Sequence, residues 1–163
     1  MRFARVAGIS AGRTPGVLAG ALEHGMRRQP SQALWTEAEA LERAGEQGKA
    51  MDLYVRAASA EEDAGRPLRA RVLWEQIAQR VGASGLVLER LANVCGRSHM
   101  REESFDYWVA AAARYHADGK AEDAARARSH AQSLKTRGIP AHEPPAIAAE
   151  AIRKGEEFVR DLL

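Results

Sequence analysis

Apolar residues recur at helical spacing along most of this chain, in segments separated by glycine or proline. Leu34, Ala38 and Leu41 follow an i, i+4, i+7 pattern that predicts a helix over residues 32–44, with Ser31 as its N-cap. No segment alternates apolar and polar residues with the period of two that a half-buried strand shows. The pattern therefore predicts an all-α fold.

The strongest pattern is a unit that occurs twice over Met51–Asp118, with Trp74 and Trp108 34 positions apart. The other aligned pairs are Tyr54 with Leu88, Ala57 with Leu91, Ala58 with Ala92, Ala70 with Ser104, and Ile77 with Ala111. Each copy contains two helical segments, predicted at about 48–64 and from 67 in the first copy, and at 85–96 and 101–117 in the second. A repeat of this length is typical of stacked helical hairpins.

The turn between the two helices of each hairpin can also be located in the sequence. Gly65 and Pro67 separate the helices of the first copy, and proline is tolerated in the first turn of a helix. In the second copy His99 occupies the position of Gly65.

The flanking segments complete the predicted domain organisation. Residues 1–14 form a basic, flexible tail; residues 15–137 form the helical repeat domain, including a divergent hairpin at 15–44; residues 138–145 form a proline-rich linker; and residues 146–163 form a C-terminal helix. The helix that follows Gly119 has a thin apolar stripe and a polar back, as a terminal cap requires. Its stripe is Ala121, Ala124, Ala127, Ala131 and Leu134.

These aligned positions resemble the tetratricopeptide repeat family. The resemblance implies a right-handed array of antiparallel helical hairpins, about three to four repeats with a C-terminal capping helix. The chain departs from the family pattern at Glu61, where a large residue is usual, and it lacks the proline common near the end of a repeat. Generic α-hairpin repeats of another family are the alternative.

The resemblance also implies a function, because members of this family bind a partner peptide or domain in a concave groove lined by the first helix of each hairpin. Carried over by position, the partner-binding residues are Asp52, Val55, Ser59, Glu62, Asp63, Leu86, Glu89, Asn93 and Arg97. The acids in this set favour a partner segment of basic or mixed charge, and Glu89 would repel a carboxylate. A solvated charged face, without a partner, is the alternative for these positions.

Composition excludes several other classes. The net charge is +2, and the cluster Arg66, Arg69 and Arg71 directly follows acids, which argues against nucleic-acid binding. The single cysteine, Cys95, lies at a core-facing position, and no two of the five histidines have helical ligand spacing. We therefore expect no catalytic site, no metal and no cofactor. We also expect no membrane span and a cytoplasmic location. The chain has 20 Arg but only 4 Lys, a composition that suggests a bacterial source.

The sequence thus predicts a non-enzymatic scaffold or adaptor. The alternative is a structural subunit or secretion-type chaperone that associates through the apolar C-terminal helix, and a homodimer stays open. The sequence does not decide whether that helix covers the array or binds a partner.

Overall fold

The computed structural model describes residues 30–163, and this part of the chain folds into helices joined by turns and one longer non-helical segment, with no strand. Its helices are α2 (Pro30–Arg43), α3 (Gln47–Asp63), α4 (Pro67–Val81), α5 (Gly85–Arg97), α6 (Arg101–Ala117), α7 (Ala121–Lys135), α8 (Ala146–Lys154) and α9 (Glu156–Val159). The all-α prediction is confirmed for these residues. The predicted tail at 1–14 and the predicted helix at 15–28 lie outside the described residues.

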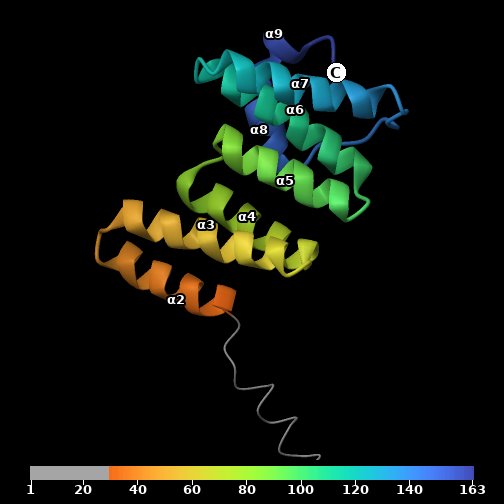
Figure 1. Cartoon of the computed structure of the whole chain (residues 1–163). Helices are drawn as coiled ribbons and strands as arrows, with labels where there is room; N and C mark the ends of the chain where they lie inside the picture. Colours follow the sequence, from red (N-terminus) through yellow and green to blue (C-terminus); the bar gives the residue numbers. More distant parts are fainter. Residues whose placement is uncertain (1–29) are drawn as a thin grey trace, which may run out of the picture.

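Each helix from α2 to α6 packs on the next one along the chain, which produces the stack seen in Figure 1. In the upper part of the stack in Figure 1, α6 lies at the centre and contacts α5, α7, α8 and α9. The run Ala110–Ala113 on α6 is completely buried, and its small side chains let these neighbours approach closely. The protein is therefore an all-helical, repeat-like array.

The predicted repeat register agrees with the burial of the side chains. All twelve aligned positions, from Tyr54 and Leu88 to Ile77 and Ala111, are buried. Trp74 is fully buried and Trp108 is 6% exposed. Positions one repeat apart thus occupy equivalent places in the core.

The turns inside the two hairpins are equivalent as well. Gly65 has φ +67° and His99 has φ +61°, a left-handed backbone conformation that favours glycine. In both turns an amide closes the end of the preceding helix: Arg66 donates to the carbonyl of Glu61 at 2.9 Å, and Met100 to that of Cys95 at 3.0 Å. His99 therefore adopts a conformation for which its side chain is unfavourable.

Replacing His99 by glycine is expected to raise the free energy of unfolding by about 1 kcal/mol, because the left-handed conformation carries no Cβ penalty in glycine. Urea unfolding monitored by circular dichroism measures this change. Gly65→Ala is the matched control, and it should lower stability by a similar amount. A His99→Gly protein less stable than the wild type would contradict the equivalence of the two turns.

The N-terminal contact between α2 and α3 differs from the prediction. Ser31 lies within α2, which begins no later than Pro30, so it is not the N-cap; it is buried, and its hydroxyl donates to the Glu61 carboxylate. Glu61 itself is 2% exposed. The Arg66 guanidinium, 2.5 Å away, and the Ser31 hydroxyl stabilise the carboxylate and lower the pKa of Glu61. A buried, hydrogen-bonded carboxylate thus occupies the place of the usual large residue.

The C-terminal segment forms two short helices where one was predicted. The break falls at Gly155, which lies against Ala113 of α6. Ile152, Val159 and Leu162 are buried. The segment is also tied to α7, because Lys135 donates its Nζ proton to the carbonyl of Leu162 at 2.7 Å. In this conformation the C-terminal segment covers α6 and contacts α7.

Residues 138–145, the predicted linker, contain no helix or strand. The side chain of His142 in this segment contacts α6. His142 places Nε2 2.6 Å from Oδ2 of the buried Asp106 and Nδ1 2.9 Å from the carbonyl of Pro140. Both ring nitrogens face oxygen acceptors, so the doubly protonated imidazolium is favoured. The Pro140 carbonyl, followed by Asp106, raises the pKa of His142. Burial raises the pKa of Asp106, a shift opposed by His142.

These shifts predict that the protein loses stability as pH rises from about 6 to 8. The folded-state pKa of His142 lies above its unfolded value of about 6.5, so its contribution is complete below that pH and is lost as pH rises through the folded-state pKa. The raised pKa of Asp106 also lowers stability as pH rises, but this loss begins at lower pH, from the unfolded value of about 3.9. Melting temperatures should fall by a few degrees over this range.

The variant His142→Gln is the control for this pH dependence, since glutamine does not titrate. Its melting temperature should change less with pH than that of the wild type. Equal pH dependence in the two proteins would show that other groups are responsible.

Candidate partner-binding surface

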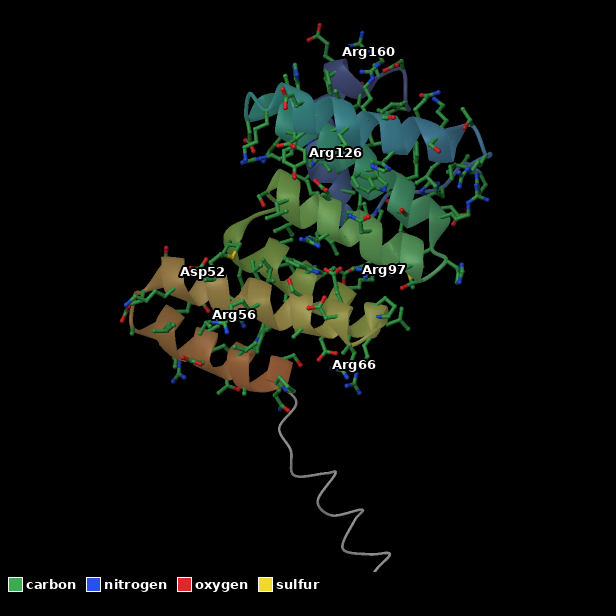
Figure 2. The ribbon with its side chains drawn as sticks, viewed as in Figure 1. Asp52, Arg56, Arg66, Arg97, Arg126 and Arg160 are labelled. Atoms are coloured by element: carbon green, nitrogen blue, oxygen red, sulfur yellow. The ribbon has the colours of Figure 1, made fainter. Side chains whose placement is uncertain are left out.

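The first helices of the hairpins, α3, α5 and α7, are joined side by side by ion pairs. Glu62 of α3 pairs with Arg97 of α5, and Glu89 of α5 pairs with Arg126 of α7 at 3.1 Å. Figure 2 shows Arg97 and Arg126 on these neighbouring helices. We call the surface that the three helices share the α3–α5–α7 face.

The residues predicted to bind a partner differ in how exposed they are. Five are exposed: Asp52, Asp63, Leu86, Asn93 and Arg97. Four are partly buried: Val55, Ser59, Glu62 and Glu89. The structure brings Glu62 and Arg97 into contact, whereas Asp52 lies ten residues before Glu62 on α3, about 15 Å along the helix axis. The predicted set is therefore spread along the face and does not converge on one point.

Two of the predicted acids are already satisfied within the chain. The Glu62 side chain is 7% exposed and accepts a hydrogen bond from the Trp74 indole at 2.8 Å in addition to its contact with Arg97. The carboxylate of Glu89 accepts from the Tyr115 hydroxyl at 2.8 Å and from Arg126. These two carboxylates have little remaining capacity to attract a basic partner. Asp52 and Asp63 stay exposed.

A hollow of about 370 Å³ lies between α5 and α7, with α6 beneath it, and we call it the α5–α7 hollow. Its lining residues are Ala92, Asn93, Gly96, Arg97, Ser104, Trp108, His130, Ser133, Leu134 and Arg137. None of them is acidic. On its lining, the His130 ring stacks on the Trp108 ring with centroids 4.4 Å apart.

The contribution of α7 to this hollow was not predicted from the sequence. The helix after Gly119 was expected to be a terminal cap with a polar back, and Ser133, His130 and Arg137 were not among the predicted partner-binding residues. One signal pointed to them: Gly119–Lys120–Ala121 repeats Gly48–Lys49–Ala50, which marks α7 as another first helix of a hairpin. Because the apolar stripe of α7 consists mainly of alanine, α7 was interpreted as a terminal cap and not as the first helix of a hairpin.

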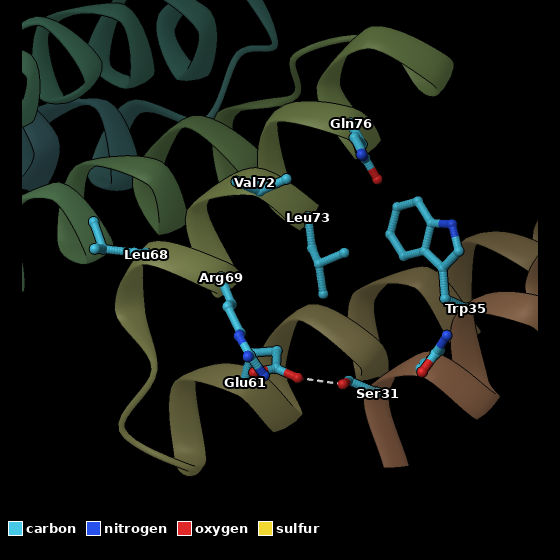
Figure 3. Close-up of a pocket in the computed structure, with 9 residues that line it drawn as sticks. Ser31, Trp35, Glu61, Leu68, Arg69, Val72, Leu73 and Gln76 are labelled. Atoms are coloured by element: carbon cyan, nitrogen blue, oxygen red, sulfur yellow. Dashed lines mark hydrogen bonds between the residues drawn. The ribbon is translucent and has the colours of Figure 1, made fainter. Parts of the chain in front are cut away.

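A second hollow, of about 540 Å³, lies between α2 and α4 and is mainly apolar (Figure 3). Trp35, Leu73, Leu68 and Val72 contribute its apolar surface, and Glu61 lies at its edge. Leu68 is 57% and Val72 51% exposed, and beside this hollow they make an exposed apolar surface on α4. This hollow was not predicted from the sequence, because these two residues lie off the predicted core stripe.

The arginines of the predicted basic cluster are used inside the protein. Arg66 pairs with Glu61, and Arg71 pairs with Glu75 and Glu103 at 2.8 and 2.7 Å. Arginines held in this way are less available to phosphate groups than a solvated basic track would be.

The one cysteine is buried, as the sequence predicted. Burial raises the pKa of the Cys95 thiol to about 12, so little reactive thiolate forms at neutral pH. Within residues 30–163, no three His, Cys, Asp or Glu side chains are grouped so as to hold a metal ion.

Comparison with known proteins does not assign this chain to a family. No family model, curated protein or solved structure matches it. The repeat-like architecture therefore rests on the 34-residue register and on the packing of the helices. In the part of the chain that the structure describes, no helix is both long and apolar enough to cross a membrane.

Proposed function

We propose that this protein is a non-enzymatic adaptor that holds a segment of a partner protein along the α3–α5–α7 face. The observation that carries the proposal is the alignment of the first helices of successive hairpins by the Glu62–Arg97 and Glu89–Arg126 pairs. Stacked hairpins present such a face as an extended binding surface. The proposal includes a right-handed, tetratricopeptide-like arrangement in which this face is the concave groove.

The chemistry along the face favours binding. Asn93 and Arg97 are exposed on α5, and the α5–α7 hollow lies beside them. Hydrogen-bond donors and an aromatic ring around an open hollow suit recognition of a peptide. The exposed Asp52 and Asp63 on α3 would contact another part of the same segment.

The alternative function is a structural subunit that associates through its C-terminal helix. It would require the C-terminal segment to leave α6, because Ile152, Val159 and Leu162 are buried in the present conformation. Size-exclusion chromatography with light scattering distinguishes the two functions. Self-association that is lost when residues 146–163 are removed would favour the subunit.

Reversing the charges of Asp52 and Asp63 to lysine is expected to weaken capture of the partner from the source cells by about tenfold, since both residues are exposed on the proposed surface. The matched control reverses Glu37 on α2 and Glu156 on α9, two exposed acids on other elements, and should retain the partner. Quantitative mass spectrometry of the captured proteins gives the ratio. A partner bound equally by both variants would remove the α3–α5–α7 face as its site.

A further inference from the structure

The α5–α7 hollow carries positive charge on both of its sides. Arg97 projects from the end of α5, and Arg137 follows α7. Within residues 30–163, the Arg137 guanidinium has no ion pair or hydrogen bond, whereas its carbonyl accepts a hydrogen bond from Arg101 at 3.2 Å. Arg97 and Arg137 thus line the hollow, and the guanidinium group of Arg101 contacts the backbone of Arg137.

Among residues 30–163, the carboxylate that pairs with one of these three guanidinium groups is that of Glu62, which contacts Arg97. Arg97 keeps 49% of its side chain exposed, and a guanidinium has five N–H donors, so it can hold a second carboxylate while it retains the first. Glu89, which the sequence suggested would repel a carboxylate, does not line the hollow and is tied to Tyr115 and Arg126. The local charge therefore favours an anion.

The polar groups are spaced for a segment that runs along the hollow. On α5, Asn93 and Arg97 are four residues apart; Ser133 lies on the last turn of α7, and Arg137 follows that helix by two residues. One helical turn rises about 5.4 Å. In an extended chain, alternate side chains are about 6.8 Å apart and point the same way. Such a chain would present about one side chain to each turn of the two helices.

We infer that the α5–α7 hollow binds the side-chain carboxylates of an extended acidic segment of a partner protein, with Arg97 and Arg137 as the anion-binding residues. This inference rests on the proposed adaptor function and names the chemistry of the partner segment. It narrows the basic or mixed partner that the sequence favoured to a segment of mixed charge whose acidic part occupies this hollow, because two of the acids behind that expectation are satisfied inside the chain. Asp52 and Asp63, which stay exposed on α3, are left to contact a basic part of the same partner.

The experiment measures binding of the full chain to synthetic peptides by fluorescence anisotropy. The probe is a labelled peptide of six Glu-Ala dipeptides with an amidated C-terminus, and Gln-Ala and Lys-Ala peptides are the comparisons. The Glu-Ala peptide should bind at least about tenfold tighter than either, and binding should weaken as salt shortens the Debye length below its value of about 10 Å at 0.1 M.

Arg137→Glu is the decisive variant, because Arg137 is exposed and its loss breaks no described side-chain contact. It should weaken binding of the Glu-Ala peptide by at least about tenfold. Arg160→Glu, the same change at an exposed residue that does not line the hollow, should alter it by less than about twofold. Thermal melts of both variants confirm that they are folded.

Three results would overturn the inference. They are equal binding of the Glu-Ala and Gln-Ala peptides, equal effects of the two arginine variants, and a free-acid peptide that binds far more tightly than the amide. The last result would assign the site to a terminal carboxylate. If the peptides fail while the Asp52 and Asp63 variant still loses the captured partner, the acidic segment is refuted and the adaptor function stands. If every variant retains that partner, the α3–α5–α7 face is not its binding site and the proposed function of that face fails as well.

Discussion

Replacing Trp74 by alanine is expected to lower the free energy of unfolding by about 3–5 kcal/mol, a large part of the stability of a domain of this size. Trp74 is fully buried on α4, so truncation leaves a cavity between the hairpins. It also removes the indole N–H that donates to Glu62 at 2.8 Å. That carboxylate is 7% exposed and would keep Arg97 as its partner. Urea unfolding measures the loss.

Two further variants separate the causes of this effect. Trp74→Phe keeps most of the ring and removes the N–H donor, so its smaller loss, about 1–3 kcal/mol, reports the hydrogen bond and the difference in ring size. Trp35→Ala, at a partly buried tryptophan of α2, should cost less than Trp74→Ala. A Trp74→Ala protein that melts at the wild-type temperature would show that the repeat register is wrong.

Replacing Gly155 by alanine is expected to cost about 1–3 kcal/mol and to loosen the C-terminal segment. A Cβ at Gly155 would lie 2.6 Å from the Ala113 Cβ and 3.0 Å from its Cα. Ala113 is buried on α6 and has no flexible side chain that could move aside. The backbone conformation at Gly155, with φ −123°, suits any residue, so the effect is steric. Hydrogen exchange of amides 146–163 should become faster.

Gly48→Ala is the matched control for this substitution. Gly48 lies in the first turns of α3, and a Cβ there would meet no atom within 4 Å. Alanine should therefore raise stability by up to about 1 kcal/mol through its higher helix propensity. A Gly155→Ala protein as stable as the wild type, with unchanged exchange at its C-terminus, would show that the contact with α6 is dispensable.

Much of the fold was predictable from the sequence because it depends on local patterns. Helical periodicity and glycine at the ends of helices identified α3 to α7 close to their observed bounds, and the 34-residue repeat identified the core positions. Cys95 was recognised as buried for the same reason. Each of these inferences needs only residues within one helix or one repeat.

The candidate site was only partly predictable. Asn93 and Arg97 were found by their positions in the repeat, and both line the α5–α7 hollow. His130 and Arg137 were not, because α7 carries few large apolar residues and was interpreted as a cap. The paired state of Glu62 and Glu89 could not be predicted, since their partners come from other helices.

The sequence by itself determined that this protein is a stack of helical hairpins and which residues form its core. Both follow from apolar residues that recur at helical spacing and from a unit that recurs along the chain. Only the tertiary structure decided which charges are available on its surface. Ser31 meets Glu61, Glu62 meets Arg97 and Glu89 meets Arg126 across 30, 35 and 37 residues, respectively. An ion pair between helices depends on side-chain positions in three dimensions, and no periodicity along the chain encodes it.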